Sequence, residues 1–489
     1  MKDNKIQYKH ILKATSIFGG VQFFNVIISV AKSKIVAVLL GTSGVGILGI
    51  LTSTLNLVLG IIRMGLDFSL VKEISASKVK IDKREVSNKI AITKRLTWLT
   101  GLLGAFIILV ISPLLSKIAF GNKDFTIYFI IISAAVFFNQ ITLGNMAILQ
   151  GFNQLKKIAK SIILASFFAL VFAAIIYYLF GQSGIPWVIV VTSVTAFLFS
   201  KYYASSINID TSKISFRAAI FEGKSMLKLG FVLSLGTLAS LLNGYLVQIF
   251  ITNQAGVEKV GLYNAGFVLI NSYVLLFFNA LSKDFFPRLS EISSDNNLVK
   301  KMVNKQAITT LLLLTPIVVI FLVFKSFIVQ LLYTEAFLSI LGMISFGIVG
   351  TIFKAVSWIM GFVIIAKNDS KLYVKVEVIS NLVLFLMVVV GYHFYGITGA
   401  GLSYLVYYIL YAILIKFVVG KYYQFKFEKD LINVIMASIG FCFTTLYVVY
   451  LSHSFTKLVV LSFLVLMSFI YTIYMFNRLI GIRELLKNK

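Results

Sequence analysis

The stretch VGILGILTSTLNLVLGIIRMGLDFSLVK, Val45–Lys72, is apolar enough to span a bilayer, yet it carries two charges near one end. On a helix, its polar and small residues share one face: Ser53, Asn56, Gly60, Arg63 and Asp67. A charge that faces lipid is expensive, so intramembrane charges usually face a protein interior or water. The stretch therefore predicts one wall of an aqueous cavity.

A simpler interpretation is that Arg63 and Asp67, spaced i and i+4, only neutralise each other at the end of the helix. The polar face continues for three turns beyond the pair, to Ser53, where an ion pair gives no reason for it. We therefore favour the cavity and keep the ion pair as the alternative.

Composition places the chain among polytopic, all-α membrane proteins. Of 489 residues, 59% are hydrophobic and 13% are charged, and a soluble domain is poorer in apolar residues and richer in charge. Cys442 is the single cysteine, and the three histidines are far apart in sequence, so the pattern predicts no disulfide and no metal site. The net charge of +27 does not indicate nucleic acid, because the lysines lie between apolar stretches.

The apolar stretches predict about 14 transmembrane helices, each of about 20 residues. They are 15–31, 45–71, 97–115, 125–150, 158–180, 186–206, 227–252, 261–281, 307–332, 340–366, 372–392, 396–419, 431–451 and 458–476. An even number places both termini on one side, and the N-terminus has no cleavage site that would make the first helix a signal peptide.

The basic residues indicate which side that is. With a cytoplasmic N-terminus, 36 of the 45 Lys and Arg residues fall in inside segments and 7 fall in outside segments. This bias predicts cytoplasmic termini. The outside connections, such as 181–185 and 393–396, are too short to hold a catalytic domain, and Lys325 is one of the seven lysines assigned to the outside.

We expect two pseudo-symmetric six-helix bundles around a central cavity, with two extra C-terminal helices. The N-terminal lobe covers 1–206, a cytoplasmic linker covers 207–226, the C-terminal lobe covers 227–419, and the two extra helices with a basic tail cover 420–489. Around the linker, 216–228 mixes bulky apolar and basic residues, as an interfacial helix does.

An internal repeat supports the two lobes. Gly41–Gly46 resembles Gly256–Gly261, and the same offset carries Asn56 onto Asn271. Shorter matches follow at a slightly different offset, such as Asp67-Phe68 with Asp284-Phe285. Such repeats predict duplicated halves related by an axis along the membrane normal, with a site at their interface.

Polar faces on other predicted helices extend the cavity wall. The first helix carries Gln22, Asn25 and Lys32 on one face, with Lys34 just beyond, and the eighth carries Asn264 and Asn271. The alternative for any one of these side chains is that it joins helices by packing and hydrogen bonds.

Lys354 lies in the middle of the tenth predicted helix, with Trp358 one turn away on the same side. A buried lysine requires an anion or a neutral state, and a cation beside an aromatic ring suits an anionic sugar conjugate. Glu377 could couple an ion or pair with Lys371 or Lys375. The cavity is cationic in net terms, with Arg63, Lys354, Lys32 and Lys34 as its anion-binding candidates, so we expect an anionic cargo.

The chain resembles the O-antigen translocases, polysaccharide flippases of the multidrug/oligosaccharidyl-lipid/polysaccharide exporter superfamily. The resemblance rests on three diffuse segments and covers nearly the whole chain: 33–49, 149–157 and 227–231. It implies two bundles around a V-shaped cavity that opens alternately to either side of a bacterial inner membrane. It also implies an undecaprenyl diphosphate-linked oligosaccharide as cargo, carried from the cytoplasmic to the periplasmic leaflet, with membrane lipids and other glycan-assembly membrane proteins as partners.

The same resemblance implies no cofactor other than a coupling proton or sodium ion, for which Asp67 and Glu377 are candidates. Many members have twelve spans, so the fourteen predicted here depart from the pattern. Two rivals remain: a cation-coupled multidrug antiporter of the same fold, which would need acidic cavity residues, and a non-transporting envelope scaffold, against which the polar faces argue. A glycan polymerase or ligase would need a larger external loop.

Overall fold

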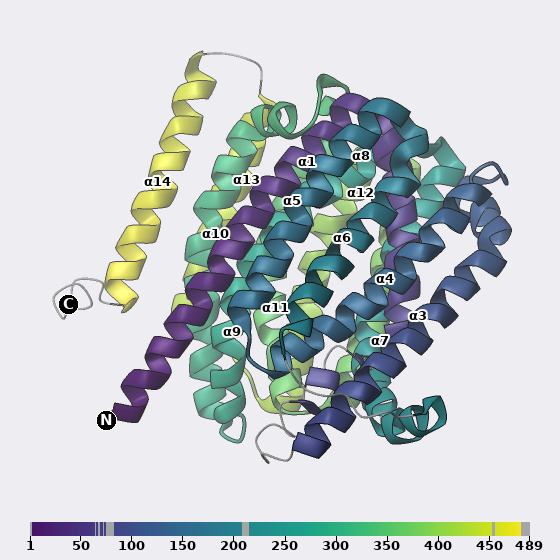
Figure 1. Cartoon of the computed structure of the whole chain (residues 1–489). Helices are drawn as coiled ribbons and strands as arrows, with labels where there is room; N and C mark the ends of the chain where they lie inside the picture. The colour runs from purple at the N-terminus through teal and green to yellow at the C-terminus, as the bar shows by residue number, and fades with distance from the viewer. Residues whose placement is uncertain are drawn as a thin grey trace. The chain divides into compact units, whose positions relative to one another are not determined.

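A computed structural model describes residues 2–63, 65–66, 69–71, 73–74, 83–207, 215–451 and 455–480, and side chains from Gly20 onward with some gaps. Helices make up nearly all of this part of the chain (Figure 1). In hydrocarbon every backbone N–H and C=O must be paired within the chain, and a helix does this locally. The predicted all-α membrane fold is therefore confirmed.

The helices have the following bounds. They are α1 (Lys2–Arg63), α3 (Lys83–Phe120), α4 (Thr126–Gly151), α5 (Leu155–Phe180), η1 (Gly181–Gly184), α6 (Ile185–Ser205), α7 (Phe216–Ala255), α8 (Val257–Phe267), the π-helix η2 (Val268–Ser272), α9 (Tyr273–Glu291), α10 (Asn296–Leu332), η3 (Glu335–Ile340), α11 (Leu341–Ala366), α12 (Ser370–Tyr423), α13 (Lys429–Tyr450) and α14 (Phe455–Ile480).

Among the described residues, ten helical stretches are long and apolar enough to cross a membrane. Three of them, Gly20–Arg63, Leu155–Ser205 and Ser370–Tyr423, contain 44, 51 and 54 residues. Each is about twice the length that one crossing needs. Each is also broken near its middle, at Gly41, at η1 and at Gly396 respectively. The predicted count of fourteen spans stays a prediction.

Backbone geometry repeats along the chain at a fixed offset. Among the described residues nine have positive φ, and six of them form three pairs with the same sequence separation: Gly41 with Gly256, Asn153 with Asn368, and Gly181 with Gly396. Asn56 and Asn271 share this separation as well. Positive φ is uncommon outside glycine and asparagine, so three coincidences at one offset support the duplication predicted from sequence.

The chain forms two compact units. The first contains 1–261 with 332–334, and the second contains 262–331 with 335–489. In the first, α3 packs on α4, α4 and α5 pack on α6, and α7 packs on α1 and α3. The helix α7 is continuous from Phe216, so the predicted interfacial segment and the seventh span form one helix. The continuity of α7 does not test the predicted lobe boundary at 207–226, which stays a prediction.

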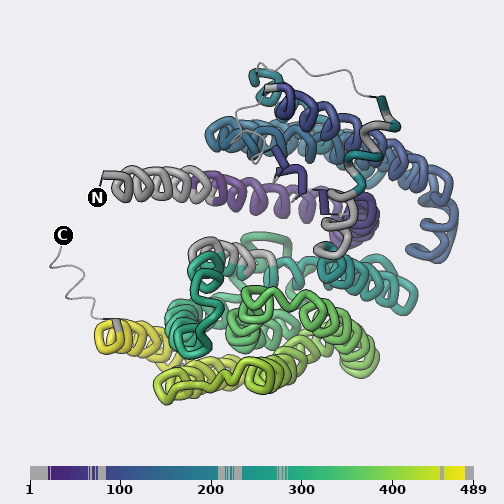
Figure 2. The backbone as a smooth tube through the Cα atoms, turned by 90° about the horizontal axis from the view of Figure 1, so that it is seen from below, coloured from purple at the N-terminus to yellow at the C-terminus, as the bar shows by residue number. Residues whose placement is uncertain are grey.

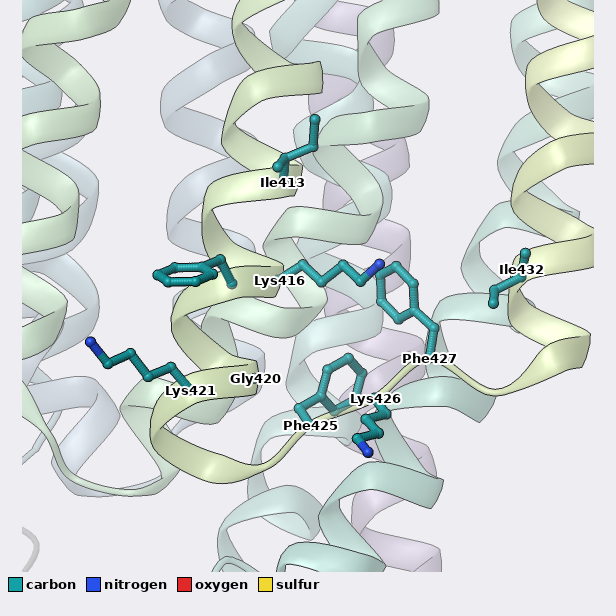
Figure 3. A pocket seen from close by; sticks show the side chains of 9 residues that line it. Ile413, Lys416, Gly420, Lys421, Phe425, Lys426, Phe427 and Ile432 are labelled. Atoms are coloured by element: carbon teal, nitrogen blue, oxygen red, sulfur yellow. The ribbon is translucent and has the colours of Figure 1, made fainter.

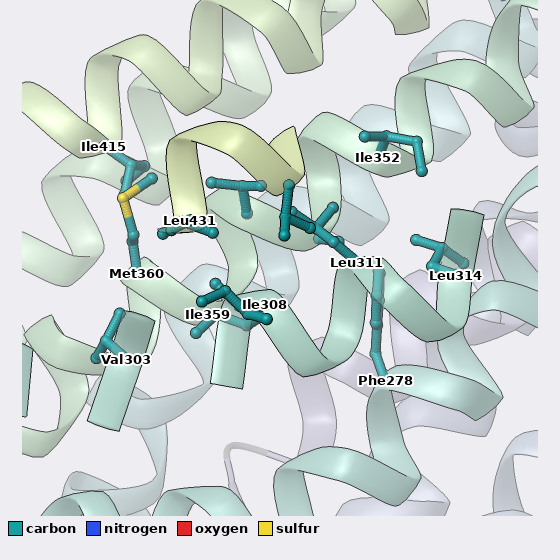
Figure 4. Close-up of a cluster of buried hydrophobic side chains, with 14 of the residues drawn as sticks. Phe278, Val303, Ile308, Leu311, Leu314, Ile352, Ile359, Met360, Ile415 and Leu431 are labelled. Atoms are coloured by element: carbon teal, nitrogen blue, oxygen red, sulfur yellow. The ribbon is translucent and has the colours of Figure 1, made fainter. Parts of the chain in front are cut away.

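The second unit is organised around a large apolar core. Its buried side chains come from α9, α10, α11, α12 and α13, including Phe278, Leu311, Ile352, Ile415 and Leu431 (Figure 4). Met475 on α14 belongs to the same core. Figure 2 shows α13 and α14, at the yellow end of the colour scale, beside the other helices of this unit. The two C-terminal helices are thus packed parts of the second unit.

Candidate anion-binding site

Lys354 on α11 is held by neutral groups only. Its ammonium donates a hydrogen bond to Asn271 Oδ1 at 2.8 Å and lies 5.2 Å from the ring centroid of Tyr408. Within the described part of the chain, no carboxylate pairs with it. An amide oxygen and a ring face attract a cation without cancelling its charge. The site therefore presents a net positive charge inside a membrane-spanning unit.

The π-helix η2 places Asn271 opposite Lys354. Asn271 lies in this five-residue π-helical turn between α8 and α9, and its amide nitrogen donates to Phe267 O at 3.4 Å. Gly347 on α11 allows the two elements to approach closely, because a Cβ at this position would overlap Ile270. Single π-turns inside α-helices often mark functional sites. The local irregularity thus serves to orient the amide.

A row of tyrosines on α12 includes Tyr408, whose ring contacts the Lys354 ammonium. Tyr404, Tyr407, Tyr408 and Tyr411 follow the spacing of one helix face. Tyr407 and Tyr411 stack with centroids 5.6 Å apart, and the hydroxyl groups of Tyr404 and Tyr263 lie 3.3 Å apart. Sequence reasoning missed this row, although the spacing of its tyrosines and a lysine on the neighbouring helix were a usable signal.

Glu377, in the first half of α12, extends the same polar region. Its carboxylate accepts from the Tyr411 hydroxyl at 3.4 Å and from the Asn381 amide at 3.5 Å. The predicted alternative, a pair with Lys371 or Lys375, does not form, since both lysines are exposed and neither reaches the carboxylate. Tyr411, which contacts the acid, is one turn along α12 from Tyr408, which contacts the cation. Neighbouring tyrosines of one helix therefore contact the half-buried cation and the acid.

Trp358 does not stand beside the Lys354 ammonium as its spacing suggested. Its ring stacks on Phe278 with centroids 4.9 Å apart and meets Phe362 edge-on at 4.7 Å. The ring packs against the apolar core of the second unit. The aromatic partner of Lys354 is Tyr408, whose ring reaches the ammonium from the neighbouring helix α12.

In the first unit, Arg63 ends α1 and lines a hollow of about 260 Å³. The polar part of its wall comes from α4, through Asn139, Thr142 and Gln150. A guanidinium with amide and hydroxyl neighbours can bind a phosphate or carboxylate. Asp67, its predicted ion-pair partner, lies outside the described residues.

The other polar candidates of the first unit divide into two groups. Some join helices: Ser53 accepts from Gln248 Nε2 at 2.6 Å, Asn25 accepts from Ser166 at 3.3 Å, and Lys34 donates to Tyr333 O at 2.5 Å. These contacts match the packing alternative for Ser53 and Asn25. The others are Gln22 and Asn56, which are exposed, and Lys32, which is half-buried. In the second unit Asn264 is half-buried. Their roles in binding stay predictions.

The internal repeat relates the two units at these positions. The offset that joins Asn56 to Asn271 also joins Asn139 to Lys354 and Ser193 to Tyr408. Asn139 donates to Ser193 Oγ at 2.7 Å, just as Lys354 contacts Tyr408. The same inter-helix contact is thus an amide and a hydroxyl in one unit and a cation and an aromatic ring in the other.

Comparisons with known proteins give a consistent result. Residues 35–342 match the model of a family described as "Polysaccharide biosynthesis protein". The "Putative O-antigen transporter" of Shigella flexneri is 25% identical over 390 residues, which cover 77% of this chain and 90% of that protein. Within the described residues, no group of three His, Cys, Asp or Glu side chains could hold a metal ion.

Solved structures share the fold at low sequence identity. "Lipid II flippase MurJ, inward closed conformation" matches with a TM-score of 0.71 and 16% identity, covering 96% of this chain and 99% of that one. An inward-facing multidrug resistance MATE family transporter of the MOP superfamily matches with a TM-score of 0.66 and 16% identity, covering 82% and 94%. At these identities the likeness concerns the fold alone.

Proposed function

Because the chain belongs to the polysaccharide biosynthesis protein family, we propose that it is a flippase for an oligosaccharide linked to a polyprenyl diphosphate, such as an O-antigen unit. The chain is a multi-pass membrane protein whose relatives are transporters. The finer proposal adds the cargo, the direction from the cytoplasmic to the periplasmic leaflet, and the inner membrane of a bacterium. Alternating access between two duplicated halves would carry it.

The observation that supports an anionic cargo is the state of Lys354. A buried ammonium usually has a counter-ion, because the cost of removing it from water is otherwise not recovered. Lys354 has an amide oxygen and a tyrosine ring instead. A diphosphate would supply the missing counter-charge, and charge-assisted hydrogen bonds are roughly twice as strong as neutral ones.

The rival function is cation-coupled drug antiport on the same fold. A binding site for organic cations needs an acid at its centre. Near Lys354 the acid is Glu377, whose carboxylate contacts Tyr411 and Asn381. We propose instead that Glu377 takes up the coupling proton or sodium ion, since protonation there would change its contact with Tyr411, one turn from the Tyr408 ring that contacts Lys354.

The function is tested in proteoliposomes that contain a polyprenyl diphosphate oligosaccharide in both leaflets. An external glycan-cleaving enzyme reports how fast the inner-leaflet pool becomes accessible. Lys354→Met should lower the rate at least about tenfold, because a hydrogen bond to a charged group contributes about 1.5–3 kcal/mol. Lys354→Arg keeps the charge and should retain part of the rate.

Lys325 offers a matched control. It is a lysine of the same unit that is buried more deeply than the half-buried Lys354. It also has neutral partners: Ser345 Oγ at 2.5 Å and the Tyr450 ring at 4.8 Å. Lys325→Met should leave translocation near the wild-type rate. Equal losses in both variants would mean that any buried charge is needed for folding. Normal transport by Lys354→Met would remove the residue from the binding site, and cationic dye efflux would then favour the antiporter.

Coupling is tested by Glu377→Gln in the same assay. The neutral side chain keeps the size of glutamate and can still bond to Tyr411, so folding should be preserved. We expect the variant to translocate at a rate that no longer responds to an imposed proton or sodium gradient. An unchanged gradient response would assign the coupling to another group.

A further inference from the structure

A basic and aromatic hollow lies where α12 ends and α13 begins, entirely within the second unit (Figure 3). Its volume is about 580 Å³. Three exposed lysines line it, Lys416, Lys421 and Lys426, together with Phe417, Phe425 and Phe427. Figure 3 shows Lys421 extending to the other side of α12 from Lys416. The proposed transport mechanism does not use any of these residues.

The charges of this hollow are not neutralised within the protein. Among the described residues none of the three lysines forms an ion pair, although Asp430 and Glu428 are close in sequence. The ammonium of Lys416 lies 4.7 Å from the ring centroid of Phe427. Figure 3 shows Lys416 extending from α12 toward this ring. A cation held over a ring face keeps its charge available to an anion.

The backbone of the hollow is fixed by buried contacts. Asn304 on α10 is fully buried, donates to Lys426 O at 3.2 Å and accepts from Glu428 N at 2.9 Å. Phe425 is buried in the core and meets Phe427 edge-on at 5.7 Å. The Gln424 N–H bonds back to Gly420 O at 3.0 Å and closes the helix end. The backbone that carries Lys421 and Lys426 is therefore held in place by hydrogen bonds and buried side chains.

Apolar and basic residues are ordered along the direction of α12. Ile413 and Phe417 are exposed apolar residues nearer the middle of the helix, and Ile432 continues this surface on α13. Lys421 and Lys426 follow at the helix end and in the connection. Lys416 lies between Ile413 and Phe417 in the sequence, and its side chain extends toward Phe427 in the same connection (Figure 3). A phospholipid has the same order, with acyl chains inward and a charged headgroup at the interface. The positive-inside bias predicts that this end is cytoplasmic.

We propose that this hollow binds a phospholipid with an anionic headgroup, whose phosphate contacts the lysines while an acyl chain lies against Ile413, Phe417 and Ile432. Free inorganic phosphate shares the headgroup chemistry but cannot use the apolar surface. The proposal is independent of the transported cargo, because it concerns a resident lipid at one edge of the second unit.

The test is native mass spectrometry of the purified full chain with equal amounts of phosphatidylglycerol and phosphatidylcholine. The first phosphatidylglycerol should bind at least about tenfold more tightly, since one lysine near an anionic surface contributes on the order of fivefold. Replacing Lys416, Lys421 and Lys426 by Gln should reduce its binding to the phosphatidylcholine level. The matched control replaces Lys156, Lys157 and Lys160 on α5 of the first unit, which carry the same charge, and should change binding less than about twofold.

A second measurement does not depend on variants. A photoactivatable phosphatidylglycerol added to the wild-type protein should form adducts within residues 413–432. Equal affinity for the two lipids, an equal loss in the control variant, or adducts confined to other segments would overturn the proposal. Full displacement of the lipid by millimolar inorganic phosphate would also overturn it, because the site would then take free phosphate. Each of these experiments measures lipid binding. The lipid proposal can therefore fail while the proposed translocation is confirmed.

Discussion

The contacts of Lys354 define what the site can bind at the scale of single residues. Asn271 Oδ1 and the Tyr408 ring orient the ammonium, and neither removes its charge. A carboxylate in place of the amide would orient the ammonium and also neutralise its charge. Replacing the amide group of residue 271 by a carboxylate would therefore be enough to neutralise Lys354.

Asn271→Asp tests this distinction without removing the lysine. The new carboxylate would stand about where Oδ1 now accepts at 2.8 Å, and would form a buried ion pair with Lys354. We expect translocation to fall at least about tenfold, because charge-assisted contacts of about 1.5–3 kcal/mol would no longer be offered to the cargo. The apparent melting temperature should not fall. Asn271→Leu is the uncharged control, and wild-type transport by Asn271→Asp would show that the free charge is not required.

The residues of this site differ in how far sequence could predict them. A lysine in the middle of an apolar stretch is conspicuous, and the repeat singled out Asn271. The contact between them could not be predicted, because it depends on the π-turn of η2. The tyrosines of α12 resemble an interfacial belt in sequence. Lys325, assigned to the outside, is buried in α10, where its ammonium bonds to Ser345, and its side of the membrane stays a prediction.

At the scale of elements, the site depends on how closely α11 and α12 pack. Small residues allow backbones to approach in membranes, where van der Waals contact replaces the hydrophobic effect. Gly401 on α12 is such a residue, since a Cβ there would overlap the backbone of Met343. Gly350 on α11 faces the backbone of Leu405 in the same way. The lysine and the tyrosines are on the two helices that these glycines bring together.

Gly401→Ala should therefore destabilise the protein by about 1–3 kcal/mol, the usual cost of overpacking. A Cβ at Gly440 on α13 meets nothing within 4 Å, so Gly440→Ala is the control and should be neutral or slightly stabilising. The apparent melting temperature in detergent measures both. If the two substitutions have equal effects, close packing of α11 on α12 does not limit stability.

Sequence predicted the element boundaries best where the chain must turn. The expected connections 181–185 and 393–396 contain the breaks at η1 and Gly396. After the predicted linker, α7 runs on from Phe216 without a break, so the predicted interfacial segment and the seventh span form one helix. The linker bounds stay a prediction. Hydropathy locates a change from apolar to polar, and a helix can continue through such a change when its backbone bonds remain local.

At the scale of the whole molecule, the duplication relates a cation in one unit to an amide at the equivalent position of the other. The positive-φ pairs keep the two halves in register, and within that register Lys354 occupies the position of Asn139. Both units have a side-chain contact at this position, between Asn139 and Ser193 in the first and between Lys354 and Tyr408 in the second. The matches to the family and to the relative confirm the resemblance to O-antigen translocases. They do not predict the difference between Asn139 and Lys354.

Cysteine labelling can test both the duplication and the orientation in the membrane. The native cysteine, Cys442, is fully buried, so single cysteines can be introduced at exposed positions without replacing it. Ser183 and Tyr395 lie near the breaks at η1 and Gly396, and Ser205 lies at the other end of α6. Asn297 begins α10.

Repeats related by an axis along the membrane normal have the same orientation, so Ser183→Cys and Tyr395→Cys should react from the same side. The positive-inside bias predicts that this side is the outside, whereas Ser205→Cys and Asn297→Cys should react with an impermeant maleimide only after the cells are opened. If Ser183→Cys and Tyr395→Cys react from opposite sides, the halves are inverted and the parallel duplication is wrong. If all four positions exchange sides together, the duplication holds and the orientation is reversed, which would place Lys416, Lys421 and Lys426 outside.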